Sequence, residues 1–311
     1  MKKYWLSFIV LVYCILVSNL DAQAEILPEY FGLEAPGADP IRFTPHILKG
    51  LGERIPSNPE MSPDYQHFFF SLVDSKDPDS PVMTIMYSHR EKTGWSKPVE
   101  ADFLKQKGFN MAEPFFSRDG KKLYFQSNRP PGKPIWNVKA FVSELKNGQF
   151  STPKYVPISD ENQGVWFPFP AKDGSIYFSS NLKDRVGRTD LYKASKDSDG
   201  NYTKILNLGP VFNTEHTEWD PYLNNEENRL IFVSDKPGGF GEVDVYMSQL
   251  AENKQWGKAI NLGEPINSEL YDTAAKLSPD GRFLFFQRII NDKEVIFWVD
   301  FNLYLKEHHL L

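Results

Sequence analysis

An apolar strand, an Asp-Gly turn and an aromatic-rich strand recur about every 54 residues along this chain of 311 residues. The turns lie at Asp119, Asp173 and Asp280, and a copy without the glycine lies at Asp64. The intervals are 55, 54 and 107 residues, and the last is twice the period, so a fifth copy is expected near position 226. Repeats of this length are typical of propellers, solenoids and arrays.

A second marker recurs out of phase with the turns. It is an aromatic residue that opens a short segment ending in Pro, Leu or Ile, and it lies at Phe43, Trp95, Phe150, Tyr202 and Trp256. Each unit therefore reads as four short strands. The Asp-Gly pairs predict hairpins, because both residues of such a turn are expected to need positive φ.

The order of the two markers predicts a closed ring. The first aromatic-led strand, around Phe43, precedes every turn, and the last unit ends near Leu305 without such a strand. The N-terminal strand is therefore expected to complete the last sheet, which removes the exposed edges of an open array. We predict an all-β fold, a five-bladed β-propeller of four-stranded antiparallel blades.

The repeat resembles the TolB-type propeller repeat of bacterial envelope proteins. The resemblance rests on residues 220–222 and 234–246, on the Ser-Pro-Asp-Gly turn at residues 278–281 and on residues 297–300. It spans roughly residues 40–305 and implies a propeller fold. Copy one lacks the glycine after Asp64, and copy four has Glu226 and Glu227 in place of Asp-Gly. The chain is too short for the extra domain of TolB, so the role of TolB is not implied.

The first 24 residues have the pattern of a secretory signal peptide. Lys2 and Lys3 precede an apolar run from Tyr4 to Val17, and Ala22-Gln23-Ala24 offers a cleavage site after Ala24. The run is shorter than the roughly 20 residues of a membrane span, so no membrane span is expected. We expect a periplasmic or secreted protein, with residues 25–39 as an irregular lead-in and residues 40–311 as a single propeller domain.

Cleavage would leave a chain without thiols, because the only cysteine is Cys14. Catalytic cysteine, zinc thiolates and disulfides are then excluded. The remaining 33 basic and 40 acidic residues give a net charge near −7, with no basic patch in the sequence, which argues against nucleic acid as a partner. We expect a monomer that uses no cofactor.

Propellers usually bind ligands at one mouth of the central channel, and the repeat indicates which residues lie there. Counting back six residues from each turn gives Asn58, Glu113, Phe167, Asp220 and Ala274. Neighbouring candidates are Trp166, Glu218, Trp219 and Asp272, together with Asn128, Arg129, Asn181, Asp235, Lys236 and Arg288 from the ends of the second strands. Acids, bases and aromatic rings around a concavity could hold a sugar or a peptide end. The alternative is that the acids satisfy backbone donors and the rings fill the channel.

A weaker candidate is a metal site at His216, Glu218 and Asp220. Alternate residues of a strand share a face, and imidazole with carboxylates suits a hard or borderline metal. The turn residues Asp119, Asp173 and Asp280 are interpreted as structural, and so are Asp190 and Asp244, which are expected to hold neighbouring backbone.

Two classes of function remain open. The first is a binding module for a protein or an envelope glycan at the channel mouth. The alternative is a carbohydrate-active hydrolase or lyase that uses Glu113 and Asp220 as acid and base, a pair of roles found in glycosidases.

Overall fold

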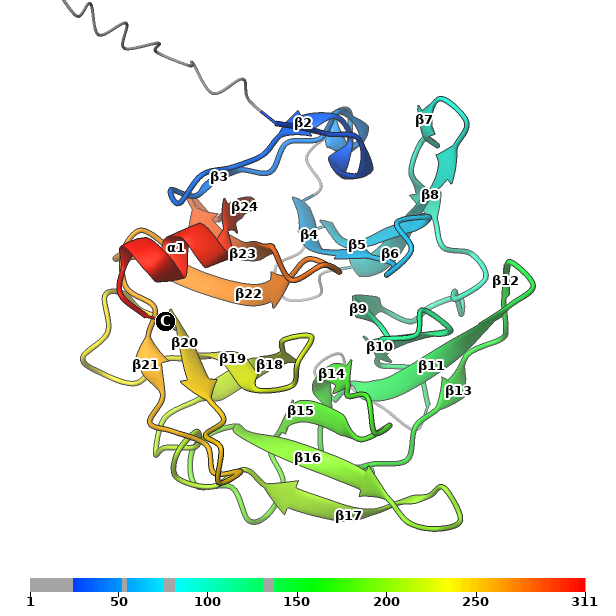
Figure 1. The fold of residues 1–311 in the computed structure, drawn as a ribbon. Helices are drawn as coiled ribbons and strands as arrows, with labels where there is room; N and C mark the ends of the chain where they lie inside the picture. Colours follow the sequence, from blue (N-terminus) through cyan, green and yellow to red (C-terminus); the bar gives the residue numbers. More distant parts are fainter. Residues whose placement is uncertain (1–24, 52–54, 75–81, 131–136, 311) are drawn as a thin grey trace, which may run out of the picture.

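The computed structural model describes residues 25–51, 55–74, 82–130 and 137–310; the expected signal peptide lies outside this part of the chain. Five antiparallel sheets surround a central axis, and each places its first strand innermost (Figure 1). The protein is an all-β, five-bladed β-propeller, as the repeat predicts. No helix of the described residues has the length and apolarity to cross a bilayer.

The blades share one strand order, from the channel outward. The innermost strands are β4 (Ile55–Met61), β9 (Met111–Phe116), β14 (Trp166–Pro170), β18 (Glu218–Leu223) and β22 (Tyr271–Leu277). The second strands are β5 (His67–Asp74), β10 (Lys122–Ser127), β15 (Ile176–Ser180), β19 (Arg229–Ser234) and β23 (Phe283–Ile290). The third strands are β6 (Val82–Glu91), β11 (Lys139–Lys146), β16 (Asp190–Lys196), β20 (Asp244–Gln249) and β24 (Lys293–Asp300). We number the blades 1 to 5 in this order.

The outer strands have two residues each, except in blade 3, where the outer strand has six. They are β7 (Gly94–Trp95) and β8 (Val99–Glu100) in blade 1, β12 (Gln149–Phe150) and β13 (Lys154–Tyr155) in blade 2, β17 (Tyr202–Asn207) in blade 3 and β21 (Ile260–Asn261) in blade 4. The outer strand of blade 5 is β3 (Ile41–Arg42).

The N-terminal strand closes the ring as predicted. β3 pairs with β24, with Ile41 opposite Trp298, and the N–H of Phe43 donates to the carbonyl of Ile296 at 2.8 Å. The paired residues precede the expected segment, whose residues His46–Leu48 form a 3₁₀ turn instead. Phe43 itself is buried and packs on Trp298, so the aromatic marker anchors the closing strand.

The turns differ in one respect from the prediction. Only the second residue of each turn has positive φ: Gly120, Gly174 and Gly281 lie between 69° and 78°. Tyr65 (57°) and Glu227 (56°) occupy this position in the two degenerate copies. The aspartate is a hydrogen-bond acceptor, because Asp119 accepts from Ser117 Oγ at 2.7 Å and from the N–H of Lys121 at 3.1 Å. The aspartates therefore shape the turns, as expected.

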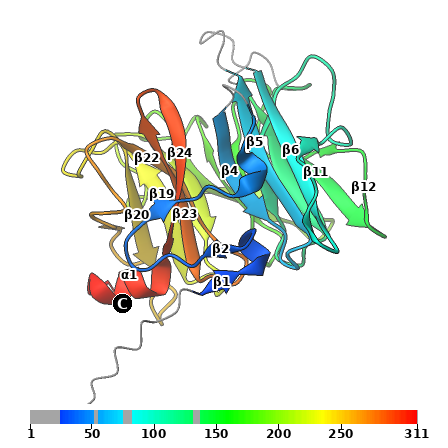
Figure 2. The ribbon, with the colours of Figure 1, turned by 90° about the horizontal axis from the view of Figure 1, so that it is seen from above.

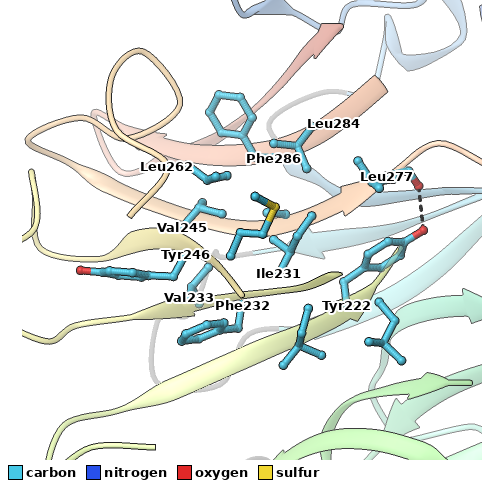
Figure 3. Close-up of a cluster of buried hydrophobic side chains, with 14 of the residues drawn as sticks. Tyr222, Ile231, Phe232, Val233, Val245, Tyr246, Leu262, Leu277, Leu284 and Phe286 are labelled. Atoms are coloured by element: carbon cyan, nitrogen blue, oxygen red, sulfur yellow. Dashed lines mark hydrogen bonds between the residues drawn. The ribbon is translucent and has the colours of Figure 1, made fainter. Parts of the chain in front are cut away.

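Large side chains fill the wedges between blades. Blades 4 and 5 share a cluster in which Ile231, Val233 and Val245 face Leu284 and Phe286 (Figure 3). Tyr222 lies at its inner edge and donates from its hydroxyl to the carbonyl of Leu277 at 3.1 Å (Figure 3). Buried apolar area of this kind is the main stabilising contribution to such a fold.

A glycine allows blade 3 to contact blade 4 closely. Gly187 precedes a parallel bridge between Thr189 and Thr217, and a Cβ at this glycine would lie 1.7 Å from the carbonyl oxygen of His216. Asp190 holds the loop by accepting from the N–H of Gly187 at 3.0 Å. Gly241, Val243 and Asp244 repeat the arrangement between blades 4 and 5. The prediction that Asp190 and Asp244 hold neighbouring backbone is confirmed.

The two ends of the described chain lie on the same side of the disc (Figure 2). The expected irregular lead-in contains a short hairpin, β1 (Ile26–Leu27) and β2 (Leu33–Glu34), joined by a 3₁₀ turn at Pro28–Tyr30. Tyr30 and Phe31 are buried in it. The chain ends in α1 (Phe301–Glu307), whose Tyr304 is also buried.

Candidate functional site

The five positions counted back from the turns form a ring of β-bulges around the channel. Their φ values are 47° at Asn58, 57° at Glu113, 53° at Phe167, 56° at Asp220 and 51° at Ala274. At each bulge the pairing of the first and second strands shifts register. Positive φ is unfavourable for residues other than glycine. Since all five blades have it, the bulge belongs to the repeat itself.

The bulges turn backbone N–H groups toward the preceding blade. Glu113 donates to Ser71 Oγ at 2.9 Å, Phe167 to Gln126 Oε1 at 3.0 Å and Ala274 to Asp220 Oδ2 at 2.7 Å. Asp220 Oδ2 also accepts from Thr273 Oγ1 at 2.6 Å. Asp220 therefore joins blade 4 to blade 5, which is the structural role that the sequence left open.

Two of the ring acids hold protons unusually strongly. Burial raises the pKa of Asp220 to about 7, against the opposing effect of its hydrogen bonds from Thr273 and Ala274. Burial, together with the charge of Asp220, raises the pKa of Glu113 well above its ordinary value. Burial also raises the pKa of the nearby Glu294. The channel centre thus favours neutral carboxyl groups.

One buried cation faces these acids. Lys276 Nζ forms an ion pair with Glu60 Oε2 at 3.1 Å and lies 4.9 Å from the ring centre of Phe115. Burial lowers the pKa of Lys276, while the charges of Glu60, Glu113 and Asp220 raise it. The pair links the neighbouring blades 5 and 1, so its geometry exists only in the closed ring.

The space beside Asp220 is very small. A cavity of about 10 Å³ lies next to Asn58, Phe167, Asp220 and Ala274, enough for roughly one water molecule. Asn58 Nδ2, Asp220 Oδ1 and Glu113 Oε2 are buried and have no hydrogen-bond partner among the described residues. A sugar ring does not fit in the cavity beside Asp220 in this conformation.

A larger pocket of about 390 Å³ opens above the ring, at the end of the channel where the innermost strands begin, here called the upper mouth. Its walls are Trp166, Phe167, Ser179, Arg188, Thr189, Thr217, Trp219, Asp235 and Tyr271, which come from blades 3, 4 and 5. The rings of Trp219 and Tyr271 lie 6.2 Å apart. The structure brings together four of the candidates from the sequence, Trp166, Phe167, Trp219 and Asp235.

Polar groups lie beside these rings. Arg188 forms an ion pair with Asp235, with 2.6 Å between Nη2 and Oδ2, and donates from Nε to Thr217 Oγ1 at 3.1 Å. The Arg188 side chain is 80% exposed, so it remains available to a ligand. Its position depends on the close contact at Gly187, and the sequence did not single it out.

Three other candidates hold loops in place. Glu218 is fully buried and accepts from Thr214 Oγ1 at 2.6 Å and from Ser234 Oγ at 3.0 Å. Asp272 is also fully buried and accepts from Arg288 Nε at 2.6 Å. Arg288 Nη2 donates in addition to the carbonyl of Ile266 at 2.9 Å. The hydrogen-bonding atoms of these three side chains are therefore occupied by neighbouring groups of the protein, which is the structural alternative considered above.

The candidates at the end of β10 are also structural. Asn128 Oδ1 accepts from the N–H of Asn110 at 2.8 Å, and Asn181 makes the same contact with Gly164 at 2.9 Å in blade 3. Arg129 is buried, stacks over Phe141 at 4.9 Å and donates to the carbonyl of Leu104 at 2.7 Å. Burial lowers the pKa of Arg129 to about 10. None of the three lines the upper pocket.

The metal hypothesis gains no support from the geometry. Glu218 and Asp220 are engaged in separate blade contacts, and His216 Nε2 lies 3.9 Å from Glu215 Oε1. Within the described ranges, no three His, Cys, Asp or Glu side chains are grouped to hold a metal ion.

Sequence reasoning missed a second hollow at the opposite end of the channel, here called the lower mouth, where the turns lie. It has a volume of about 210 Å³, and its walls include Tyr30, Phe43, Arg118, Phe169 and Tyr222. These residues come from the lead-in, the closing strand and three blades. Phe169 and Tyr222 occupy equivalent positions in the repeat, four residues before Asp173 and Glu226, whereas Tyr30 belongs to the lead-in, so the repeat by itself marked only part of this pocket.

Fold and site define the class of protein as a five-bladed propeller with an aromatic pocket at its upper mouth. No known family matches the sequence, and no curated protein is similar to it. Among solved structures the chain is similar to the α-L-arabinofuranosidase from Lactobacillus brevis, with 12% identity over 79% of this chain and 90% of that one and a TM-score of 0.50.

TolB from Acinetobacter baumannii is also among the similar structures. It has 16% identity, a TM-score of 0.48 and coverage of 79% of this chain, which spans 54% of that TolB chain. The Trypanosoma rangeli sialidase has 13% identity, a TM-score of 0.47 and coverage of 82% and 56%. Identities this low concern the fold alone.

Proposed function

We propose that this protein is an exported binding module that holds an envelope glycan in the aromatic pocket of its upper mouth. The observation that carries the proposal is the pocket of about 390 Å³ in which Trp166, Trp219 and Tyr271 stand beside the Arg188–Asp235 pair. Indole and phenol rings stack on the apolar faces of sugars, while charged and hydroxyl groups fix their orientation. Export rests on the signal-peptide pattern of residues 1–24.

The dimensions of the channel favour binding over hydrolysis. The carboxyl pair proposed for catalysis, Glu113 and Asp220, lies below the pocket, and the cavity beside Asp220 is about 10 Å³. A glycosidase needs two carboxyl groups on either side of a sugar. The raised pKa of Asp220 suits a general acid, but its Oδ2 atom is already engaged with Ala274.

The test is a binding screen of the mature protein against envelope oligosaccharides. Short peptides are screened in parallel, and binding is measured by the change in tryptophan fluorescence. Trp219→Ala should weaken binding by about 2 kcal/mol, or roughly thirtyfold, as for a central aromatic contact. Phe240→Ala is the control, because Phe240 is half exposed and does not line the pocket.

Three outcomes contradict the proposal. Binding of peptides alone would assign the pocket to a protein partner. Equal loss in the Trp219 and Phe240 variants would place the ligand elsewhere. Turnover of an oligosaccharide that Asp220→Asn abolishes while binding persists would make the protein a hydrolase or lyase.

A further inference from the structure

Four cations gather around a hollow on the lower face, between blades 2 and 3. Arg118, Lys122, Lys172 and Lys196 line this pocket of about 420 Å³, together with a single acid, Asp119. The whole chain has the opposite balance, with 35 basic and 41 acidic residues. A local excess of positive charge in an acidic protein attracts anions.

The three lysines keep their ammonium groups available. No hydrogen bond or ion pair links Lys122 Nζ, Lys172 Nζ or Lys196 Nζ to another described residue; Lys196 Nζ lies 5.1 Å from the ring centre of Tyr202. Desolvation and the charge of Lys122 lower the pKa of Lys196. An anion placed between the two lysines would relieve this repulsion.

The nearby carboxylates are engaged elsewhere. Asp119 Oδ1 accepts from Ser117 Oγ and from the N–H of Lys121 within its own turn. Glu144, which lies opposite Lys122 in the sheet, pairs with Lys146 at 2.5 Å. Neither carboxylate is hydrogen-bonded or ion-paired to a lysine of the hollow, although the charge of Lys122 helps to lower the pKa of both. Glu227 Oε1 accepts from the backbone N–H of Lys172 at 2.5 Å, so the positive charge is partly balanced.

Arg118 separates this hollow from the aromatic pocket of the lower mouth, since it lines both, as do Ser117 and Lys172. Its guanidinium lies over the rings of Phe169 at 5.0 Å and Tyr222 at 5.4 Å. It donates to Asn225 Oδ1 at 2.7 Å and to backbone carbonyls, and it has no carboxylate partner among the described side chains. The pocket of about 210 Å³, whose walls include the rings of Phe169 and Tyr222, therefore adjoins the cationic hollow.

We infer that the lower mouth is a second binding site, for a small amphiphilic anion whose apolar group enters the aromatic pocket and whose carboxylate or phosphate meets Lys122, Lys172 and Lys196. The volume suits a single ring or a short alkyl chain. This site lies at the opposite end of the channel from the proposed glycan pocket and does not depend on it.

The experiment measures binding of phenyl phosphate and benzoate to the mature protein by calorimetry or NMR, with inorganic phosphate and benzyl alcohol as references. The aromatic anions should bind at least about tenfold more tightly than either reference, because only they use both walls. Added salt should weaken their binding. The phosphate and carboxylate arms distinguish the two headgroups.

Variants decide where the anion binds. Lys122→Gln combined with Lys196→Gln should weaken binding of phenyl phosphate by about five- to tenfold. Lys92→Gln with Lys97→Gln changes the net charge equally at two exposed positions on either side of β7 and should leave binding unchanged. Trp219→Ala should also leave it unchanged, which separates this site from the glycan pocket.

The inference fails if the Lys122 and Lys196 variant binds as tightly as the wild type, or if the control variant loses as much. It fails as well if inorganic phosphate binds as tightly as phenyl phosphate, since the aromatic pocket would then contribute nothing.

Discussion

The carboxylate of Asp220 accepts a hydrogen bond from the backbone N–H of Ala274 at 2.7 Å, so that the bulge of blade 4 holds the bulge of blade 5. The same carboxyl group has its pKa raised to about 7 by burial. Protonation of the Asp220 carboxyl group is thus linked to the contact between blades 4 and 5, and this link has a measurable consequence.

We expect the free energy of unfolding to decrease as the pH rises from about 4 to about 7. The pKa of Asp220 is about 7 in the folded protein and near 3.8 in the unfolded chain. The folded state therefore binds more protons in this window, and its stability falls as they are lost. Asp220→Asn keeps an acceptor for Ala274 and should flatten the pH profile measured by urea unfolding.

The exposed Asp199→Asn variant is the control for this experiment. Glu113 and Glu294, whose pKa values are also raised, should leave a weaker slope in the Asp220 variant. An unchanged slope would mean that Asp220 is already ionised in the folded protein at pH 4.

Gly187→Ala should destabilise the protein by about 2–3 kcal/mol, because the new Cβ would lie 1.7 Å from the backbone oxygen of His216 and force blades 3 and 4 apart. Thermal unfolding measures the effect. Gly37→Ala serves as the control, since a Cβ there meets nothing within 4 Å. Equal melting temperatures for the two variants would show that the contact between blades tolerates a methyl group.

Phe43→Ala should cost about 3–4 kcal/mol of unfolding free energy, because it empties a buried site between the closing strand and Trp298. Ile41→Ala, two residues earlier and 45% exposed, should cost less than about 1 kcal/mol. Urea unfolding of both variants compares them directly. If the two changes cost the same, the N-terminal segment does not anchor blade 5.

Arg118→Met should lower stability by about 2–3 kcal/mol. It removes the donor to Asn225 and to the carbonyl of Asn224, leaving partly buried acceptors of blade 4 without that partner. Lys121→Met, in the same turn but exposed, is the matched control. Chemical denaturation that finds both variants equally stable would mean that water replaces the guanidinium at the lower mouth.

The repeat determined the architecture because each of its elements forms from residues that are close together in the sequence. An Asp-Gly turn and an alternating strand need only neighbouring residues, and the count of markers required the N-terminal strand to complete blade 5. The same counting located the bulge ring and the aromatic residues Trp166, Phe167 and Trp219. It also identified Asp190 and Asp244 as structural residues.

Tertiary structure decided which of these residues face a ligand. Glu218 and Asp272 seemed equivalent to the pocket residues, but Thr214 and Arg288 satisfy them, and such contacts depend on side-chain direction rather than on sequence spacing. Three features each join different blades: the Asp220–Ala274 hydrogen bond, the Arg188–Asp235 ion pair and the cationic hollow. Only the closed ring brings these groups together, since distances between blades depend on packing and not on the period of the sequence.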